Sequence, residues 1–552
     1  MNGILSTAIV TLFLCGDIMA GRGIDQILPH SAPPQLFEPS VSDARTYVDL
    51  AEQRNGPIPY PVDFDYVWGD ALAEFRSYQP VVKIGNLETS ITAAGEPWPD
   101  KAIHYRMHPD NVPLLEAAGF DVMELANNHV LDWGYAGLAE TLETLHRAGL
   151  RTAGAGLNRT EAEAPAVIET AGGRRVIVFA FGARSSGIPE QWAATATRPG
   201  VNLLDEFSTA EAEQIGRRVR ALKRPGDIVV ASLHWGGNWG YEIPARHRQF
   251  AHLLIDRGGI DLVHGHSSHH VKGIELYRGK LILYGCGDLL TDYEGIGGYE
   301  EYRGDLGLMF FPRLDSTGRL AGLELVPMQL RRFRLNRAST TDAAWLKETL
   351  NREGKNLGTG FELRKDGTLV LRREEPSAHA PASGSSLVAT QADYGKERIM
   401  EIHSPAFADQ AAIPRQYTCQ GADVSPPLNW SGVPADAQSL VLIVDDPDAP
   451  DPRAPKMTWV HWLLYNLPPD CKGLPEAVRQ LPSGTGEGMN DWRRTGYGGP
   501  CPPVGRHRYI HKLYALDTQL TGLERPNKAR LEAAMAGHIL AQAQLVGTYQ
   551  KH

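Results

Sequence analysis

Residues 124–134 read ELANNHVLDWG and continue an apolar run, FDVM, that begins at position 120. A run that ends in two amides, a histidine and an aspartate has two interpretations. It is a turn, because Asn and Asp favour turns, or it is a catalytic loop at the carboxyl end of a strand, where open α/β sheets hold their ligands. The rest of the sequence has to distinguish the two.

The bulk composition bounds the class of protein. The 552 residues predict about two to four domains, and 42% hydrophobic and 22% charged residues are ordinary for a soluble globular protein. A net charge of −10 argues against nucleic-acid binding as the main function. Residues 4–15 are interpreted as a buried first strand rather than a signal peptide, because no basic segment precedes them and no small-residue cleavage site follows. No transmembrane segment is expected.

The cysteines are sparse. The chain has five, none of them in a CxxC pair, so neither a structural zinc site nor a disulfide framework can be read from their spacing. Sparse cysteine fits a reducing compartment, and the expected location is therefore the cytoplasm.

Residues 1–373 predict an α/β layered unit, because apolar runs alternate with amphipathic helical patterns. The predicted strands lie at 7–17, 81–88, 120–126, 174–182, 227–236, 260–266 and 280–288. Residues 374–397, rich in Pro, Ser, Ala and Gly, predict a flexible linker. Residues 398–552 predict a mostly β domain with strands at 439–446, 458–467 and 507–516 and one helix at 530–542.

Several strands of the first unit end in side chains that can bind a metal. The candidates are Asp17, Glu88, Asn128, His234, His266 and His269. Singly, each has an ordinary explanation as a turn or loop residue, but their shared position at strand ends is harder to explain without a metal site. Carboxylate, amide and imidazole ligands without thiolate suit Mn, Fe or Zn. Two such ions would clamp a phosphoryl group and activate a water molecule.

These motifs resemble the CapA family, which is tied to poly-γ-glutamate capsule synthesis and has a calcineurin-like metallophosphatase fold. The resemblance rests on GDIMAGR, IGNLETSIT, ELANNHVLDWG, SLHWG, LVHGHSSHH and YGCGDLL, in family order. It implies that the six residues above bind two divalent metal ions, with Glu88 as the bridge. It also implies that His129 is a general acid or oxyanion stabiliser oriented by Asp132, and that the substrate is a phosphorylated or γ-glutamyl compound.

Two features near these motifs bear on the substrate. Met19 stands where the wider phosphoesterase pattern has a histidine ligand, which leaves one metal short of a ligand. Trp235, Trp239 and Tyr241 follow a proposed ligand and are either packing residues or a wall facing the substrate.

The second unit contains DPDAP, WVHW and GPCPPVGRHRY in that order. This trio resembles the phosphatidylethanolamine-binding protein family, in its bacterial YbhB/YbcL-like (Raf kinase inhibitor-like) branch. The resemblance implies a β domain with a pocket for a small anionic ligand. The pocket residues would be Asp446, Asp448, His461, Pro502, His507 and Tyr509. Cys501 lies in the last of these motifs and Cys419 in YTCQGADVSPPLNW (417–430), which belongs to the same resemblance; whether they pair is left open.

Three functions remain open from the sequence. The chain is a CapA-like metal-dependent hydrolase of capsule synthesis fused to a ligand-binding module, a generic metal-dependent phosphoesterase, or a non-catalytic scaffold of polymer assembly with a ligand-sensing domain.

Overall fold

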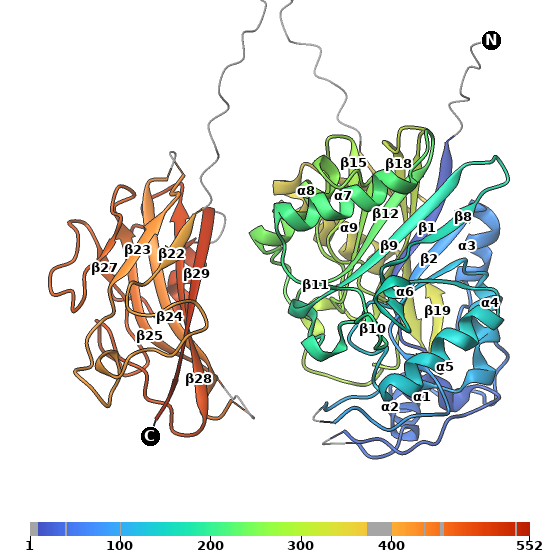
Figure 1. Ribbon diagram of the computed structural model, residues 1–552, viewed down its shortest axis with the longest axis horizontal. Helices are drawn as coiled ribbons and strands as arrows, with labels where there is room; N and C mark the ends of the chain where they lie inside the picture. Colours follow the sequence, from blue (N-terminus) through green and yellow to red (C-terminus); the bar gives the residue numbers. More distant parts are fainter. Residues whose placement is uncertain are drawn as a thin grey trace, which may run out of the picture. The chain divides into compact units, whose positions relative to one another are not determined.

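The computed structural model describes residues 9–38, 41–99, 101–372, 400–434, 437–452, 457–535 and 538–551. The chain divides into two compact units, Met1–Ala380 and Pro381–His552 (Figure 1). The predicted linker, residues 374–397, lies outside the described residues. Each unit is therefore described by itself.

The first sheet of the N-terminal unit has a parallel half and an antiparallel half. The parallel half contains β1 (Val10–Ile18), β2 (Val82–Leu87), β5 (Val122–Glu124) and β6 (Arg151–Ala153). The antiparallel half continues from β1 through β17 (Leu306–Leu314), β18 (Leu320–Arg331), β21 (Leu369–Leu371) and β20 (Phe361–Leu363). Two shorter strands pair off this path, β16 (Asp288–Leu290) with β1 and β19 (Arg334–Arg337) with β18.

The second sheet is mainly parallel. Its order is β11 (Leu203–Leu204), β9 (Arg175–Ala183), β12 (Ile228–His234), β13 (Leu262–His266), β15 (Lys280–Leu283) and β14 (Ile274–Tyr277), with β8 (Ala166–Glu169) antiparallel to β9. Two small ladders lie outside both sheets: β3 (Ser90–Ile91) with β4 (Arg106–Met107), and β7 (Ala155–Gly156) with β10 (Gly200–Val201).

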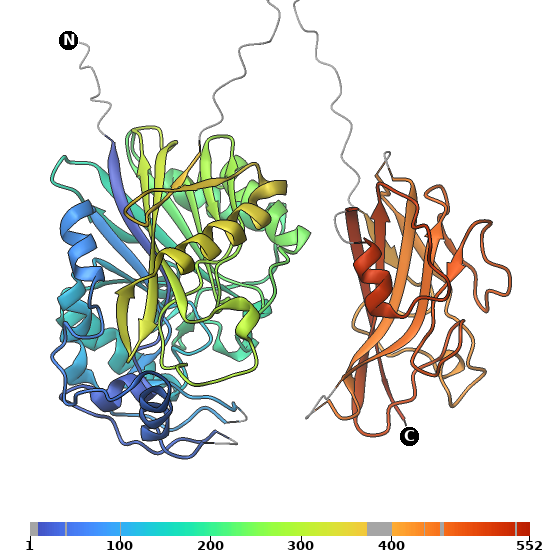
Figure 2. The ribbon, with the colours of Figure 1, turned by 180° about the vertical axis from the view of Figure 1, so that it is seen from behind.

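The helices cover the outer faces of the two sheets (Figures 1 and 2). The first sheet packs against α2 (Arg45–Asn55), α3 (Ala71–Tyr78), α4 (Pro113–Ala118) and α5 (Gly134–Arg147). The second packs against α7 (Thr209–Leu222) and α8 (Ala245–Asp256). The remaining helices of this unit are α1 (Arg22–Ile27), α6 (Arg159–Glu163) and α9 (Thr340–Gly354).

Central strands are apolar on both faces because each face packs against a different layer. In β1, Leu12 and Leu14 belong to the core shared by the two sheets, whereas Phe13 and Cys15 belong to the core under α2–α5. β9 alternates in the same way between the shared core and the core under α7 and α8. Continuous apolar runs are the expected pattern for strands buried on both faces. The prediction of an α/β first unit is confirmed.

The C-terminal unit is mostly β, as predicted. One sheet has the order β27 (Gly486–Glu487), β25 (Met457–Leu467), β24 (Ser439–Ala449), β28 (Arg506–Leu516) and β29 (Ile539–Gln550). The other has β22 (Glu401–His403), β23 (Leu428–Ser431) and β26 (Gly473–Leu474). Apolar side chains from both sheets share one core.

The predicted helix at 530–542 is wrong in its second half. Helix α10 covers only Lys528–Met535, and residues from Ile539 onward form β29. β29 pairs antiparallel with β28 from Ile539 to Gln550. The backbone hydrogen bonds of this long pairing outweigh the helical preference of the Ala- and Leu-containing segment, because intrinsic propensity is weak compared with tertiary pairing.

Cys419 and Cys501, 82 residues apart, form a disulfide with a Cα–Cα distance of 5.4 Å. The backbone N–H of Cys419 also donates to the carbonyl of Pro500 at 3.1 Å, so the two loops are joined twice. The other three cysteines carry free thiols. Disulfides persist mainly in oxidising compartments, so this bond weighs against the cytoplasmic location expected from the cysteine count.

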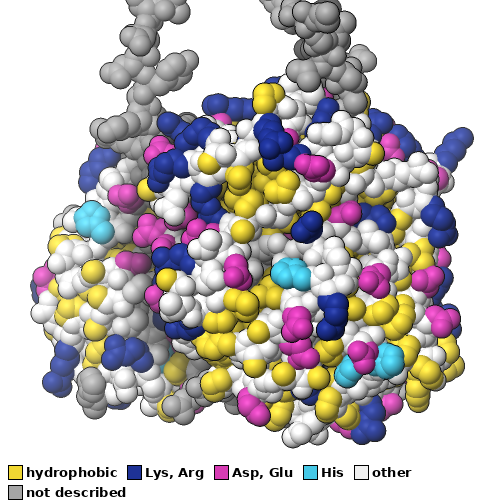
Figure 3. Space-filling view, turned by 45° about the vertical axis from the view of Figure 1, so that its right-hand side comes forward, with side chains coloured by type: hydrophobic (Ala, Val, Ile, Leu, Met, Phe, Trp, Pro, Cys, Tyr) yellow, Lys and Arg dark blue, Asp and Glu magenta, His cyan; other side chains and the backbone are white. Residues whose placement is uncertain are grey.

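The surface carries both signs of charge. On the face drawn in Figure 3, Lys and Arg side chains are interspersed with Asp and Glu side chains. Within the described residues, no helix has both the length and the hydropathy that crossing a membrane requires.

Candidate metal centre and anion pocket

The six predicted metal ligands lie at or just after the carboxyl ends of strands from both sheets. They are Asp17 in β1, Glu88 after β2, Asn128 after β5, His234 and His266 at the ends of β12 and β13, and His269 in the next loop. The strand that ends at His234 lies in register with the one that ends at His266. Because parallel strands end at the same edge of a sheet, residues far apart in the chain meet here.

The loop that follows β5 is both a turn and part of the site. The Oδ1 of Asn127 accepts the backbone N–H groups of His129 and Val130, at 3.0 and 2.9 Å, and so forms the turn. Asn128 then points toward His234, with its Oδ1 2.8 Å from Nε2. Both interpretations of residues 124–134 are therefore correct for different residues of the same loop.

Asp17 lies at the centre of the cluster. Its side chain belongs to two groups whose ligand atoms all lie within 4.8 Å of one another, one with His234 and His266 and one with His269 and Asp288. Asp17 is therefore the residue that these two groups share. Glu88, which was predicted to be the bridge, contacts one imidazole: its Oε1 lies 3.5 Å from Nε2 of His234.

The carboxylates of the cluster are buried and crowd one another. Burial, followed by the charge of Asp288, raises the pKa of Asp17 to about 7, and burial together with the charge of Asp17 raises that of Glu88. Asn86 partly relieves this repulsion, because its Nδ2 donates to Asp17 at 2.8 Å and to Glu88 at 2.5 Å. Asn127 donates to the Oδ1 of Asn86 at 3.0 Å and thereby fixes the orientation of that amide.

The cluster fits a divalent metal ion by its own chemistry. The Oδ2 of Asp17 is buried and has no hydrogen-bond partner among the described residues, and buried carboxylate oxygens are normally partnered. The nearby ligand atoms are carboxylate, amide and imidazole, which suit Mn, Fe or Zn. A cation would satisfy the unpartnered oxygen and offset the repulsion between the carboxylates.

Asp288 joins the cluster although it was not among the predicted ligands. It lies beside Asp17 because β16 pairs in parallel with β1, with Asp17 opposite Asp288, and its two oxygens lie 3.1 Å from Nδ1 of His269. A Cβ at Gly16 would lie 1.7 Å from the carbonyl oxygen of Gly287, so only glycine permits this close approach. Asp288 thus adds a carboxylate to a site that has Met19 in place of a ligand.

The loop between His266 and His269 is strained. Ser267 has a φ of 99°, a conformation that costs a non-glycine residue of the order of 1–3 kcal/mol. Such strain persists where the surroundings impose it, and here the loop positions both His266 and His269. His269 has a raised pKa because the attraction of Asp288 outweighs burial, which alone would lower it.

His129 and Asp132 form the predicted pair. Nδ1 of His129 lies 2.7 Å from Oδ2 of Asp132, and that carboxylate is fully buried. Because an ionised carboxylate only accepts, Nδ1 carries hydrogen and Nε2 is left to exchange a proton. Burial lowers the pKa of His129 to about 4, so the ring is neutral at pH 7.

Lys101 and Tyr105 complete the surroundings of this pair, and the sequence analysis did not identify them. Nζ of Lys101 lies 2.7 Å from Oδ1 of Asp132 and 3.1 Å from Nδ1 of His129. The ring of Tyr105 stacks on His129 at 4.0 Å, and its backbone N–H donates to Asp132. Both residues come from a loop without a recognisable motif, so only the fold places them here.

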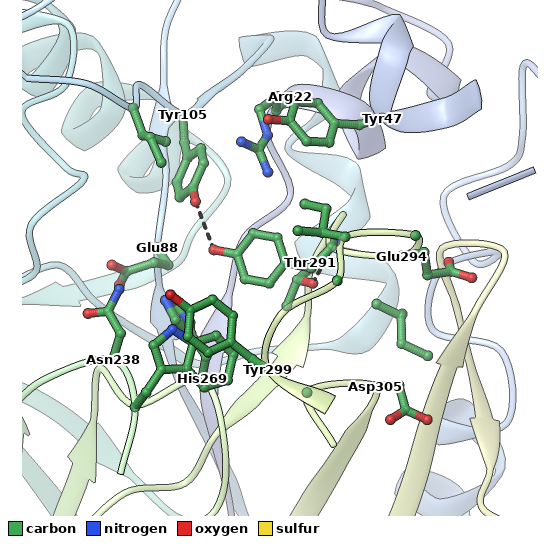
Figure 4. Close-up of a pocket in the computed structure, with 18 of the residues that line it drawn as sticks. Arg22, Tyr47, Glu88, Tyr105, Asn238, His269, Thr291, Glu294, Tyr299 and Asp305 are labelled. Atoms are coloured by element: carbon green, nitrogen blue, oxygen red, sulfur yellow. Dashed lines mark hydrogen bonds between the residues drawn. The ribbon is translucent and has the colours of Figure 1, made fainter. Parts of the chain in front are cut away.

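A cavity of about 990 Å³ opens beside the cluster (Figure 4). Glu88, Asn128, His129 and His269 line one part of it, and Tyr105 and Tyr293, whose hydroxyls are hydrogen-bonded to each other at 2.7 Å, line another. This volume is in the range of sites for drug-sized ligands and far exceeds the space that a phosphate group needs.

The three aromatic residues after His234 have different roles. Trp239 lines the cavity and stacks on Tyr299 at 4.1 Å, as a substrate-facing residue would. Trp235 is 3% exposed and stacks on His247 at 4.6 Å, so it is a packing residue. Tyr241 packs against Tyr302.

In the C-terminal unit, the predicted pocket residues lie on or beside neighbouring strands β24, β25 and β28. His507 is fully occupied internally, with Nδ1 2.7 Å from Asp446 and Nε2 2.9 Å from the carbonyl of Val504. Asp448 forms an ion pair with Arg508 at 2.6 Å rather than with an imidazole. The two aspartates and His507 therefore have their partners within the domain, and none of these contacts leaves an obvious donor for a ligand.

His461 is better placed than His507 to contact a ligand. Its Nδ1 donates to the carbonyl of Gly498 at 2.7 Å, which leaves Nε2 for another partner. Its ring meets that of Tyr509 edge-on at 5.0 Å, and Tyr509 and Pro502 are both buried. Burial lowers the pKa of His461 to about 4, so the imidazole is neutral at pH 7.

Fold and site together define a two-domain protein: a mixed α/β unit with a cluster of side chains that could hold a metal ion, and a β domain of the phosphatidylethanolamine-binding type. Residues 11–293 match the family described as bacterial capsule synthesis protein PGA_cap, and residues 403–550 match the phosphatidylethanolamine-binding protein family. The chain belongs to the bacterial capsule synthesis protein (PGA_cap) family and carries a C-terminal phosphatidylethanolamine-binding protein domain.

Similar proteins cover the two units separately. A probable polyglutamine synthesis accessory protein of Mycobacterium tuberculosis is 50% identical over 365 residues, which are 66% of this chain and 96% of that protein. A UPF0098 protein of Methanothermobacter thermautotrophicus is 48% identical over 155 residues, 28% of this chain and 99% of that protein. The crystal structure of a phosphatidylethanolamine-binding protein homologue from Chlamydia trachomatis is 44% identical, covers 28% of this chain and 99% of its own, and has a TM-score of 0.27.

Proposed function

We propose that this chain is an accessory enzyme of poly-γ-glutamate or capsule synthesis, and that its N-terminal unit is a hydrolase with two divalent metal ions. The observation that carries the proposal is the position of Asp17, which is common to two groups of potential ligands and has an unpartnered buried oxygen. Two sheets with helices outside and ligands at the strand ends also support the calcineurin-like metallophosphatase architecture expected from the sequence. The name of the mycobacterial relative supports the biological role.

In this proposal, Asp17, Glu88, Asn128, His234, His266 and His269 hold the metal ions, and Asp288 joins them. Bound ions would act as Lewis acids on a phosphoryl or carbonyl oxygen and would activate water. His129 exchanges a proton with the reacting group through Nε2, because Asp132 holds Nδ1. The ammonium group of Lys101 keeps Asp132 in place at 2.7 Å.

The test is elemental analysis of the full-length protein combined with a substrate screen. We expect about two equivalents of Mn, Fe or Zn per chain, turnover of a γ-glutamyl peptide, and loss of turnover with a chelator that is reversed when metal is restored. Faster turnover of generic phosphoesters than of γ-glutamyl compounds would favour the phosphoesterase. Absence of metal even after reconstitution would reject the hydrolase and favour the scaffold.

We also propose that the C-terminal domain binds a small anionic ligand through His461 and Tyr509. Of the residues predicted to contact the anion, we retain these two. His507 is left out because both of its ring nitrogens already have hydrogen-bond partners within the protein. Replacing His461 by alanine should weaken binding of inorganic phosphate by roughly 10–100-fold, the value of a hydrogen bond to a charged group. Calorimetry on the full-length protein measures this, with the exposed His538→Ala as control. Equal phosphate affinity in the two variants would exclude the assignment.

The cellular location stays a prediction. The sparse cysteines predict the cytoplasm, whereas the Cys419–Cys501 disulfide favours an oxidising compartment. Thiol labelling of the protein in intact cells distinguishes the two, since both cysteines react only where the disulfide is absent.

A further inference from the structure

Glu124 is a fully buried carboxylate that the mechanism above does not use. It is the last residue of β5, and its side chain faces two imidazoles. Its Oε2 lies 3.2 Å from Nδ1 of His264 and 3.3 Å from Nε2 of His266, close enough for charge attraction although it forms a hydrogen bond with neither ring. Burying a carboxylate completely costs free energy unless its charge is paired. The position of Glu124 between two imidazoles therefore needs an explanation.

The contacts of His266 differ on its two nitrogens. Nδ1 faces the metal cluster, 2.8 Å from Nδ1 of His234 and 3.8 Å from Oδ1 of Asp17. Nε2 faces away from the cluster, 2.6 Å from Oγ of Ser232 and 3.3 Å from Glu124. An imidazole binds a metal ion through the nitrogen that carries no hydrogen, so the tautomer of His266 decides whether Nδ1 can be a ligand.

Of the two groups near Nε2, only Glu124 discriminates between the tautomers. The hydroxyl of Ser232 can donate or accept and is compatible with either tautomer. An ionised carboxylate only accepts, so it favours hydrogen on Nε2 and leaves the lone pair on Nδ1, toward Asp17 and His234.

His264 lies on the other side of Glu124. Its Nε2 lies 2.8 Å from the carbonyl oxygen of Cys15, and its Nδ1 lies 3.2 Å from Oε2 of Glu124. His264 and His266 are two residues apart on β13 and therefore lie on the same face of the strand. Contacts thus run from the backbone of β1 through His264 and Glu124 to His266.

We propose that Glu124 is a positioning residue of the metal centre, which holds His266 in the tautomer with hydrogen on Nε2 and so makes Nδ1 the metal-binding nitrogen. The inference rests on the proposed function, in which His266 binds metal. Outer carboxylates that orient ligand histidines typically contribute 10–100-fold to metal affinity.

The test compares full-length Glu124→Gln and Glu124→Asp with the wild type. Glutamine keeps the shape of the side chain but its amide can donate to Nε2, whereas aspartate keeps an acceptor. We expect Mn²⁺ affinity, measured by calorimetry, to fall roughly 10–100-fold in Glu124→Gln with unchanged stoichiometry, and to fall less in Glu124→Asp. The control is Glu275→Gln, because Glu275 is also buried and bound to a histidine, with Oε1 3.0 Å from Nε2 of His252, outside the cluster.

A second readout reports the tautomer directly. In metal-free protein labelled with ¹⁵N-histidine, the His266 signals are assigned by their disappearance in His266→Ala. We expect them to show hydrogen on Nε2 in the wild type and in Glu124→Asp, and a shift toward hydrogen on Nδ1 in Glu124→Gln. A merely structural role of Glu124 would not move this equilibrium, and the wild-type spectrum alone tests the proposal if a variant fails to fold.

The outcomes separate the two proposals. A wild type that binds no Mn²⁺ overturns the proposed function and this inference with it. A wild type that binds Mn²⁺, together with unchanged affinity and tautomer in Glu124→Gln, overturns only the positioning role. Loss of one metal equivalent in Glu124→Gln, with normal affinity for the rest, would make Glu124 a ligand itself and also overturn it.

Discussion

Replacing Asp17 by asparagine is expected to abolish metal binding and turnover while it stabilises the metal-free protein. Metal binding at the proposed site is lost because Asp17 is common to two of the three groups of potential ligands. Asparagine retains the oxygen that accepts from Asn86 at 2.8 Å, so the local structure is preserved. Stability rises because the substitution removes a buried charge that is repelled by Asp288.

The stabilisation has a characteristic pH dependence. Folding raises the pKa of Asp17 from 3.8 to about 7, so between these values the folded protein binds more protons than the unfolded chain. The stability of the metal-free wild type therefore falls as pH rises through this window. The advantage of Asp17→Asn should grow from about pH 4 to about pH 7 and then stay constant, at roughly 1–4 kcal/mol.

Denaturant unfolding of chelator-treated protein at several pH values measures this effect, and elemental analysis measures the metal. Asp261→Asn is the matched control, since Asp261 is also buried but is paired with Lys223 and Lys280, both at 2.7 Å. That variant should lose stability and retain metal. Normal metal content in Asp17→Asn would show that the ligands have been wrongly assigned.

Replacing His129 by alanine is expected to lower turnover by about 10²–10⁴-fold while the metal content stays unchanged. His129 lines the cavity and is held by Asp132 rather than by the ligand cluster. The chemical step should therefore slow, with little change in KM. Asp132→Asn should have a smaller effect in the same direction, because the ring then loses the carboxylate that holds its Nδ1.

Steady-state kinetics on the substrate found for the wild type, beside elemental analysis, test this. The control is His146→Ala, an exposed histidine on α5 that lies 2.9 Å from Thr152. If His129→Ala loses metal together with activity, His129 is a ligand and not a proton-transfer residue. Full activity would mean that another group transfers the proton.

Much of the candidate site could be predicted from the sequence because it follows from local patterns. An apolar run that ends in Asp17 or in Asn128 and His129 shows both a strand and the polar residues at its end, and parallel strands share one edge. Asp288 does not follow this rule: the predicted strand 280–288 ends at Leu283, and Asp288 begins β16 and reaches the cluster because β16 pairs with β1. Asn86 stands two residues before Glu88 at the end of the predicted strand 81–88, so the same pattern indicates that it lies near the site.

Other residues could not be predicted because their roles depend on partners distant in the chain. Lys101 meets Asp132 only through the folding of a loop without a motif. Glu124 interrupts an apolar run, but nothing near it in the sequence indicates that it lies beside His264 and His266. These histidines are 140 and 142 positions further along the chain. The occupied nitrogens of His507, which shift the pocket toward His461, likewise depend on packing.

By itself, the sequence determined the two domain types, the parallel strands that carry the candidate ligands, and the set of side chains at their ends, because hydrophobic period and turn chemistry act over a few residues. It did not show β17 and β18, which form the antiparallel half of the first sheet. Only the tertiary structure decided which of these side chains share a ligand group, that Cys419 bonds to Cys501, and that residues from Ile539 onward form a strand rather than a helix. Those outcomes arise from contacts between segments that are far apart in the chain. The free energy of these contacts exceeds the local conformational preference of each segment, and such contacts produce no periodic pattern in the sequence.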